Sequence, residues 1–270
     1  MKELLIRSVS GLLMGAVLLA CVFVSPWSWA ALLLFVIAVG TFEMSRLMKM
    51  DTPTGILVGE ALAIGSFTLP ALCALEVMAP RWLLLEMPIV MLPFLYALFS
   101  VKHDAKPVFT YLFASLTFLS LPSSLMLFMY GEDLFGQLAG PRLIILVFCI
   151  LWINDIFAYL TGRLLGRHKL FERISPGKTI EGSIGGLLFT LVSLVVFCHY
   201  SGWFSLPQAI GLGVIAVVFG TLGDLCESML KRQAGVKDSG KLIPGHGGIL
   251  DRFDSVMFSV PFIFVYLLLL

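Results

Sequence analysis

The sequence predicts an all-α, polytopic integral membrane protein built as a helical bundle. Of its 270 residues, 59% are hydrophobic and only 13% are charged, and the mean hydropathy is +0.99. A water-soluble domain needs a much larger polar surface. The apolar residues also form runs of about 20 residues, the length with which a helix crosses a hydrocarbon core of ~30 Å.

We expect about nine transmembrane helices within a single membrane domain, residues 1–270. They are predicted at residues 4–24, 27–47, 55–79, 82–100, 108–130, 141–163, 182–203, 206–229 and 249–270. In the first, Gly11 and Gly15 have the GxxxG spacing that lets helices approach closely, which permits a homodimer without requiring one. The letters LLAC at 18–21 resemble a lipoprotein cleavage site, but another apolar segment follows them, so we expect an uncleaved first span.

The lysines and arginines predict the orientation. With the N-terminus in the cytoplasm, all of the 18 basic residues except Arg81 and Arg142 fall on the cytoplasmic side, as the positive-inside rule requires. Eight or ten spans would break this alternation. The net charge of +1 therefore conceals a basic cytoplasmic face, which suits anionic lipid headgroups and nucleotides.

Polar residues are concentrated in the second half of the chain. Up to about residue 140 the spans are rich in Leu, Ala, Phe and Met, and the acids Glu43, Glu60 and Glu86 are scattered. We therefore expect residues 1–140 to be mainly scaffold. Residues 141–270, which contain two polar cytoplasmic loops, are expected to hold the catalytic site.

The first group of candidate residues surrounds the last polar loop. Asp224 and Glu227 are three residues apart and share a helix face, and Asp251 and Asp254 repeat this spacing at the next span. Carboxylates at membrane depth are unfavourable unless cations neutralise them, so the four imply a bound cation or fixed basic partners. Oxygen ligands together with phosphates favour Mg²⁺ over zinc. The alternative is a set of salt bridges that joins two helices, with Lys231, Arg232 and Arg252 as partners.

The second group lies between residues 155 and 186. Ser175, Pro176 and Gly177 precede an expected helix start, where exposed backbone amides and Lys178 can hold a phosphate. The GKT at 177–179 is not a Walker A motif, because Glu172 stands where that motif has its first glycine. The alternative is a solvated basic loop that only sets the topology.

His246 allows two interpretations. It can carry a proton, or it can orient a phosphate or cap a tight turn. Gly247 and Gly248, which follow it, allow the backbone to approach a ligand closely.

Both polar segments resemble the phosphatidate cytidylyltransferases, also called CDP-diacylglycerol synthases. The resemblance extends over about residues 150–260. In the last loop it rests on Ser228, Lys231, Arg232, Lys237, Asp238, His246, Gly247, Gly248, Asp251, Arg252 and Asp254. In the earlier loop it rests on Asp155, Ala158, Tyr159, Gly162, Arg163, Ser175, Pro176, Lys178, Thr179, Glu181 and Gly182. Ile156 departs from the threonine that the family often has after the aspartate.

The resemblance implies that CTP reacts with phosphatidic acid to give CDP-diacylglycerol and pyrophosphate for phospholipid biosynthesis. It implies Mg²⁺, and admits a monovalent cation such as K⁺ beside it. The expected metal ligands are Asp224 and Asp251, supported by Glu227 and Asp254. The expected catalytic residues are Asp224, Asp251, Lys231, Arg232, Lys237, Asp238 and His246. The expected substrate-binding residues are Asp155, Ser175, Lys178, Thr179, Glu181, Lys241, Gly247, Gly248 and Arg252.

These expectations place the protein in the cell (inner) membrane, with its active site on the cytoplasmic side and no nucleic-acid partner. Two other functions remain open. A CTP-dependent polyprenol or lipid kinase would share the nucleotide chemistry. An ion-coupled transporter would need related halves with polar breaks in both, whereas this chain is polar in one half only.

Overall fold

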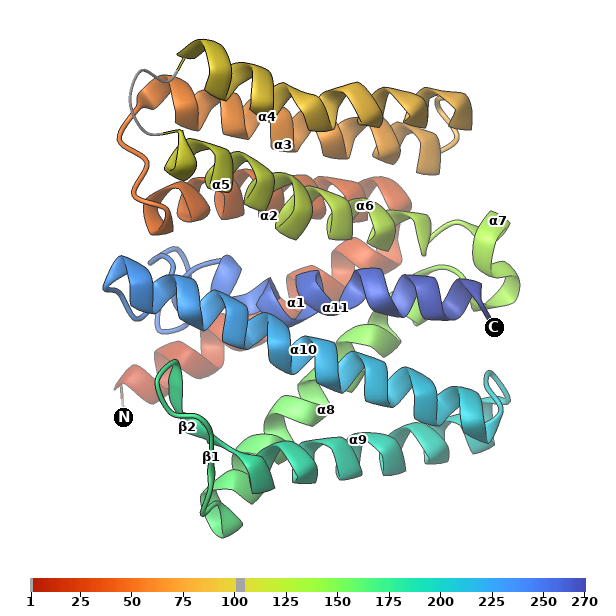
Figure 1. Ribbon diagram of the computed structural model, residues 1–270. Helices are drawn as coiled ribbons and strands as arrows, with labels where there is room; N and C mark the ends of the chain where they lie inside the picture. Colours follow the sequence, from red (N-terminus) through yellow and green to blue (C-terminus); the bar gives the residue numbers. More distant parts are fainter. Residues whose placement is uncertain (1, 101–104) are drawn as a thin grey trace. The chain divides into compact units, whose positions relative to one another are not determined.

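The computed structural model describes residues 2–100 and 105–270 (Figure 1). Lys102, one of the basic residues assigned to the cytoplasmic side, lies outside this range. The first half contains α1 (Lys2–Val24), α2 (Pro26–Leu47), α3 (Pro53–Ala74), η1 (Pro80–Leu85), α4 (Glu86–Ser100), α5 (Lys106–Ala114), η2 (Ser115–Ser120) and α6 (Leu121–Phe128). The second contains α7 (Glu132–Phe135), η3 (Gly136–Leu138), α8 (Pro141–Leu165), β1 (Lys169–Phe171), β2 (Ser175–Thr179), α9 (Ile180–Ser201), α10 (Leu206–Ala234) and α11 (Leu250–Leu268).

The all-α membrane fold is confirmed, since each predicted span coincides with a helical segment. In the described part of the chain, 7 helical segments are long and apolar enough to cross a membrane: Pro26–Leu47, Pro53–Ala74, Pro80–Phe99, Lys106–Phe128, Pro141–Leu165, Ile180–Ser201 and Leu206–Ala234. The terminal helices α1 and α11 are not among them, and α11 opens with Asp251, Arg252 and Asp254. The number of about nine transmembrane helices and the orientation of the termini stay predictions.

Local sequence explains where several helices begin. Pro26, Pro53 and Pro141 occupy the first helical position, where the missing amide hydrogen removes no helical bond. Ser25 and Ser28 add a reciprocal capping box to α2, with both backbone-to-hydroxyl distances at 3.0 Å.

The loop before α9 differs from the prediction. Residues 169–171 and 175–179 form an antiparallel hairpin, with Lys169 opposite Thr179. Helix α9 begins only at Ile180, and Thr179 caps it by accepting a hydrogen bond from the Gly182 amide at 3.1 Å. Ser175, Pro176 and Gly177 thus lie just before a helix start as expected, but they belong to a β-strand paired with residues 169–171 instead of a loop.

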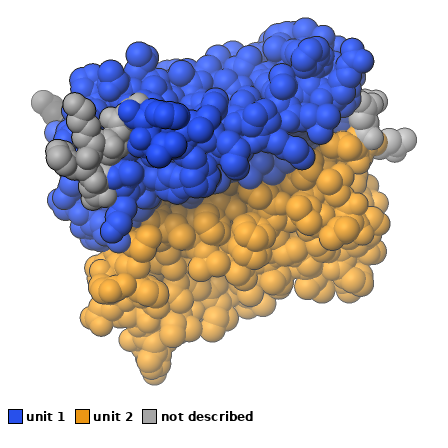
Figure 2. Space-filling model, turned by 45° about the horizontal axis from the view of Figure 1, so that its top comes forward, with its two compact units in different colours: residues 1–131, 230–253 blue, residues 132–229, 254–270 orange. Residues whose placement is uncertain are grey.

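The chain divides into two compact units (Figure 2). Unit 1 comprises residues 1–131 and 230–253, and unit 2 comprises residues 132–229 and 254–270. The predicted division of roles at residue 140, with scaffold before it and the catalytic half after it, stays a prediction. The polar segment 230–253 belongs with the helices that the sequence marks as scaffold.

In unit 1, α3 packs against α2, α5 and α6, and α4 packs against α5 (Figure 1). The core of this unit includes Trp29, Leu33, Tyr111 and Leu119, all fully buried.

In unit 2, α8 and α9 cross at close range through small residues. A Cβ atom on Gly182 would lie 2.7 Å from the Ala158 carbonyl oxygen and 3.1 Å from the Gly162 Cα. Only glycine therefore allows the two backbones to approach this closely. This crossing fixes the position of β2 and α9 beside α8, where the pocket described below is found.

Candidate active site

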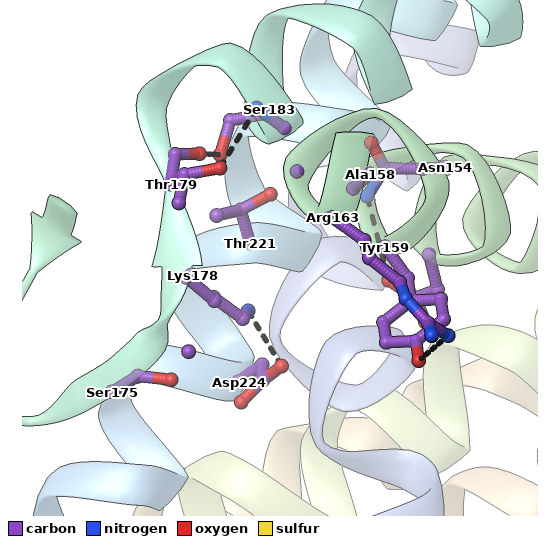
Figure 3. A pocket seen from close by; sticks show the side chains of 14 residues that line it. Asn154, Ala158, Tyr159, Arg163, Ser175, Lys178, Thr179, Ser183, Thr221 and Asp224 are labelled. Carbon is purple, nitrogen blue, oxygen red and sulfur yellow. Dashed lines mark hydrogen bonds and ion pairs between the residues drawn. The ribbon is translucent and has the colours of Figure 1, made fainter. Parts of the chain in front are cut away.

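Unit 2 contains a cavity of about 390 Å³ (Figure 3), within the usual range for small-molecule sites. Helix α8 contributes Asn154, Asp155, Ala158, Tyr159, Gly162 and Arg163 to the lining, and β2 contributes Ser175, Gly177, Lys178 and Thr179. Helices α9 and α10 complete the lining with Gly182, Ser183, Thr221 and Asp224. The cavity thus brings together both groups of candidate residues, Asp224 from the first group and Lys178 from the second.

An ion pair connects the two groups of candidate residues across this cavity. The Lys178 ammonium lies 2.5 Å from Oδ2 of Asp224, and the two side chains are 27% and 30% exposed (Figure 3). One turn further along α10, the Ser228 hydroxyl donates to Oδ1 of Asp224 at 3.1 Å. The pair is therefore ordered by its neighbours and still open to a ligand.

The α8 side of the cavity presents further polar groups. Arg163 donates a hydrogen bond to the Tyr159 hydroxyl at 3.3 Å, and Asp155 is exposed beside the buried Asn154. A guanidinium and an ammonium within one cavity suit a phosphate-bearing ligand. The predicted substrate-binding residues Asp155, Ser175, Lys178 and Thr179 are thus brought together.

Glu181 does not line the cavity. Its carboxylate accepts hydrogen bonds from the backbone amides of Arg167 and His168 and lies 2.6 Å from Nδ1 of His168. These contacts tie the start of α9 to the beginning of the hairpin. The structure thus gives Glu181 a local structural role, and its substrate contact stays a prediction.

Unit 1 contains a second, more enclosed cluster. Lys231 Nζ lies 2.6 Å from Oδ1 of Asp251, with side-chain exposures of only 11% and 4%. Oδ2 of Asp251 accepts hydrogen bonds from the amides of Ser239 and Gly248 at 2.9 and 2.8 Å. Several donors around one buried carboxylate stabilise its charged form. Asp251 and Lys231 are therefore fixed in a defined geometry.

Gly247 shows why a glycine stands beside this cluster. Its φ of +84° is a conformation that favours glycine, and a Cβ atom there would lie 2.6 Å from Oδ2 of Asp251. The two glycines after His246 thus bring the loop backbone against the aspartate.

His246 is tied to the first helix. Its Nδ1 lies 2.8 Å from the Ser10 hydroxyl, which donates to the Pro244 carbonyl at 2.9 Å. The ring also packs against Gly11, where a Cβ would lie 3.4 Å from Cε1. Gly11, one half of the GxxxG spacing, thus faces a residue of the same chain.

The remaining basic residues of the loop are exposed. Arg232 donates to the Val236 carbonyl at 3.1 Å, while Lys237, Asp238, Lys241 and Arg252 lie on the surface. Exposed cations in this position can attract phosphates. The structure does not bring them into the Lys231 and Asp251 cluster.

The predicted metal ligands divide between the units. Asp224, Glu227 and Asp254 belong to unit 2, and Asp251 belongs to unit 1. Glu227 is fully buried, and Asp254 accepts a hydrogen bond from the Ser255 amide at 2.7 Å. Among residues 2–100 and 105–270, no group of three or more His, Cys, Asp or Glu side chains is arranged to hold a metal ion. The metal site stays a prediction.

Sequence reasoning missed Glu43. This α2 residue is 3% exposed, and its carboxylate accepts hydrogen bonds from the Ser239 hydroxyl and from the amides of Ile249 and Leu250. The sequence indicated Glu43 only through its position, because an ionisable residue within an apolar span usually has a specific role.

Comparison with known proteins agrees with these observations. Residues 5–270 match the model of a family described as "Cytidylyltransferase family". A phosphatidate cytidylyltransferase of Staphylococcus saprophyticus is 41% identical over 174 residues, which is 64% of this chain and 66% of the relative. The phosphatidate cytidylyltransferase of Staphylococcus epidermidis is 49% identical over 146 residues, which is 52% of this chain and 54% of the relative. That of Staphylococcus aureus is 49% identical over 131 residues, which is 48% of this chain and 50% of the relative. The chain thus spans about half to two thirds of the length of these curated relatives.

Proposed function

Because the chain belongs to the cytidylyltransferase family, we propose that it transfers the cytidylyl group of CTP to phosphatidic acid. The products are CDP-diacylglycerol and pyrophosphate. The names of the relatives support this reaction. The observation that carries the proposal is the Lys178–Asp224 pair, which connects the two groups of candidate residues across one cavity.

The chemistry requires alignment and neutralisation of charge more than an activated nucleophile. A phosphate oxygen of phosphatidic acid attacks the α-phosphorus of CTP, a new P–O bond forms, and the bond to the β-phosphate breaks to release pyrophosphate. The nucleophile is already anionic, so no covalent enzyme intermediate is needed. Catalysis then depends on holding two polyanions in line and stabilising the charge that develops.

The lysines and arginines have corresponding roles in this proposal. Lys178 and Arg163 bind a phosphate in the cavity of unit 2. The surface residues Arg232, Lys237, Lys241 and Arg252 attract anionic substrates. Lys231 holds Asp251 in a charged and ordered state, as its 2.6 Å contact supports.

We also propose Mg²⁺ as the cofactor, with Asp224 and Asp251 each as ligands. Lysines engage Oδ2 of Asp224 and Oδ1 of Asp251, and hydrogen-bond donors engage the other oxygen of each, so the ion would replace one of these partners. Magnesium in nucleotide sites uses one or two protein carboxylates and completes its sphere with water and phosphates, so the sparse carboxylates fit it. When bound, the ion would neutralise charge on the reacting phosphates. Glu227 and Asp254 are proposed as supporting residues, and K⁺ as a possible second cation stays a prediction.

The proposed location is the cell membrane, with the site at the cytoplasmic side, where CTP is available. The multi-pass helical structure and the bacterial relatives support this location. A homodimer stays a prediction of the glycine spacing in α1.

An assay of the purified chain with CTP, Mg²⁺ and phosphatidic acid tests the function. We expect CDP-diacylglycerol and pyrophosphate in equal amounts. A polyprenol in place of phosphatidic acid provides the contrasting substrate, because a CTP-dependent kinase would release CDP and a phosphorylated lipid. Release of CDP without pyrophosphate would refute the proposal, and so would the absence of any nucleotide turnover.

A further inference from the structure

We propose that Glu43 of α2 is a positioning residue for Asp251, acting through Ser239 and the first backbone amides of α11. The inference rests on the proposed function, in which Asp251 contributes to catalysis. It assigns a role in the reaction to a residue of the apolar first half of the chain.

Glu43 binds both ends of the polar segment. Oε2 accepts hydrogen bonds from the Ser239 hydroxyl at 2.9 Å and from the Leu250 amide at 3.0 Å. Oε1 accepts a hydrogen bond from the Ile249 amide at 3.1 Å. All three donors are about 200 residues away in sequence, and two of them lie at the N-terminus of α11, where a negative charge is favoured. One buried carboxylate thus closes the loop that contains residues 240–248.

Asp251 depends on the same segment. Oδ2 accepts from the Ser239 amide at 2.9 Å, from the Ser239 hydroxyl at 3.0 Å and from the Gly248 amide at 2.8 Å. The Ser239 hydroxyl oxygen lies within hydrogen-bond distance of both Glu43 and Asp251, and it has a single hydrogen to donate to them. Ser239 therefore couples the two carboxylates directly, while its backbone amide fixes Asp251 independently of the hydroxyl.

Two glycines, Gly240 and Gly248, leave room for the Glu43 carboxylate. A Cβ atom on Gly240 would overlap the Glu43 carboxylate, and one on Gly248 would overlap both that carboxylate and the Ser239 hydroxyl. Any side chain at these positions would displace Glu43 from its donors. The glycines thus support a specific requirement for a carboxylate here, beyond general helix packing.

Glutamine at position 43 has nearly the same shape but lacks the second acceptor. Its amide NH₂ group would face a donor, either the Ile249 amide or the pair formed by the Ser239 hydroxyl and Leu250 amide. A buried donor left without an acceptor is strongly unfavourable. Asp251 would then lose the fixed position of Ser239 and of the α11 N-terminus. Loss of such a supporting contact reduces metal affinity or activity by about 10- to 100-fold in other proteins.

The test compares Glu43→Gln with wild type in two measurements on purified, full-length protein. The first is the thermal stabilisation produced by Mg²⁺ alone, with Asp251→Asn as the reference variant. The second is the Mg²⁺ concentration for half-maximal activity, together with kcat. We expect Glu43→Gln to raise the Mg²⁺ requirement and to lower kcat, each by about 10-fold or more, and to reduce the Mg²⁺-dependent stabilisation.

Glu86→Gln is the matched control. Glu86 is another glutamate within an apolar span of unit 1, and it accepts a hydrogen bond from the Ser66 hydroxyl at 2.6 Å. It has the same carboxylate group as Glu43, and its hydrogen-bond partner Ser66 lies in α3 instead of the segment that contacts Asp251. We expect this variant to keep the wild-type Mg²⁺ response. An equal shift in both variants would show that any glutamate within an apolar span matters, and would overturn the positioning role.

Variants of Ser239 keep the proposal testable if Glu43→Gln does not fold. Ser239→Ala should reproduce the Mg²⁺ shift in part, and Ser239→Thr, which keeps the hydroxyl, should restore the wild-type response. The double variant Glu43→Gln with Ser239→Ala should be less impaired than the two single effects combined, because both act on one network. Full additivity would contradict the coupling, and so would an unchanged Mg²⁺ response in Ser239→Ala.

The outcomes separate this inference from the proposed function. If wild type forms no CDP-lipid, the function fails, while the Mg²⁺-dependent stabilisation still measures the effect of Glu43 on Asp251. If wild type forms CDP-lipid and Glu43→Gln behaves like wild type in both measurements, only the positioning role fails. A wild-type melting temperature that does not respond to Mg²⁺ would also overturn the positioning role.

Discussion

Two lysine–carboxylate pairs in the described part of the chain have nearly the same length and very different surroundings. Lys178 and Asp224 are 2.5 Å apart and more than a quarter exposed, while Lys231 and Asp251 are 2.6 Å apart and almost enclosed. Distance alone therefore does not distinguish them. What differs is the number of groups that fix each carboxylate.

Asp251 is fixed by two backbone amides, a serine and a lysine, whereas Asp224 has a serine and a lysine and faces a cavity. Removing one partner of a buried pair leaves an uncompensated charge, while a half-exposed pair can exchange its partner for a ligand or water. We therefore interpret the Asp251 cluster of unit 1 as a rigidly fixed carboxylate, and the Asp224 pair of unit 2 as a carboxylate that is open to a ligand.

The most damaging single change is expected to be Asp251→Asn. The asparagine side chain lacks the negative charge that Lys231 neutralises. Its NH₂ group would also replace one carboxylate oxygen and would then face other hydrogen-bond donors. We expect activity to fall by about 10³-fold or more, with a loss of stability of about 1–3 kcal/mol. Steady-state assays and thermal melts on the same preparation measure both effects. A stable, active variant would show that the enclosed pair has no catalytic role.

Asp224→Asn is expected to reduce activity by about 10²-fold while leaving the melting temperature close to that of wild type. Both side chains of the pair are partly exposed, so removing the Asp224 charge leaves the Lys178 charge in contact with solvent and not buried without a partner. Mixed outcomes are informative here. A large drop in stability with normal specific activity would identify the pair as a structural link between β2 and α10.

Substitution of Lys178 tests whether the cavity binds phosphate. Lys178→Met keeps the length and removes the charge, so we expect KM for the anionic substrate that it contacts to rise by about 10-fold, more than kcat falls. Lys178→Arg is the control that keeps the charge, and it should recover part of the affinity. Equal KM values for both variants would show that charge at this position is irrelevant to binding.

Much of the fold could be predicted because long apolar runs and basic residues have direct physical meaning. Each predicted span corresponds to a helix, although α10 continues to Ala234 and carries Lys231 and Arg232. The hairpin at 169–179 was missed, because its strands are short and polar, without the alternation that marks a half-buried strand.

The candidate site was predicted through its motifs and not through its long-range contacts. The sequence identified Lys178, Asp224, Lys231 and Asp251 as site residues, but their pairing into Lys178–Asp224 and Lys231–Asp251 depends on tertiary structure. Glu43 could not be linked to Ser239, since no local pattern relates residues 196 positions apart. Only the packing of α2 against the polar segment reveals that contact.

The smallest effect is expected for His246→Gln. At cytoplasmic pH the phosphate of phosphatidic acid is largely ionised, because the second pKa of a phosphate monoester is about 6. General-base catalysis, typically worth ~10²–10⁴-fold where a proton must be removed, then has little to contribute. The structure supplies another role: when the Ser10 hydroxyl donates to Pro244, Nδ1 of His246 donates to Ser10 and links the loop to α1.

Glutamine can replace this hydrogen bond, so His246→Gln should lose less than about 10-fold in activity and keep the wild-type pH profile. Ser10→Ala removes the same link from the other side and is the matched control. If His246 acts only as a tether, both variants should lose similar, small amounts of activity. Three results together would contradict this role. His246→Gln would be as inactive as Asp251→Asn and would recover activity at higher pH, while Ser10→Ala would keep wild-type activity. In that case His246 would be the catalytic base, and unit 1 would supply a proton acceptor as well as a fixed carboxylate.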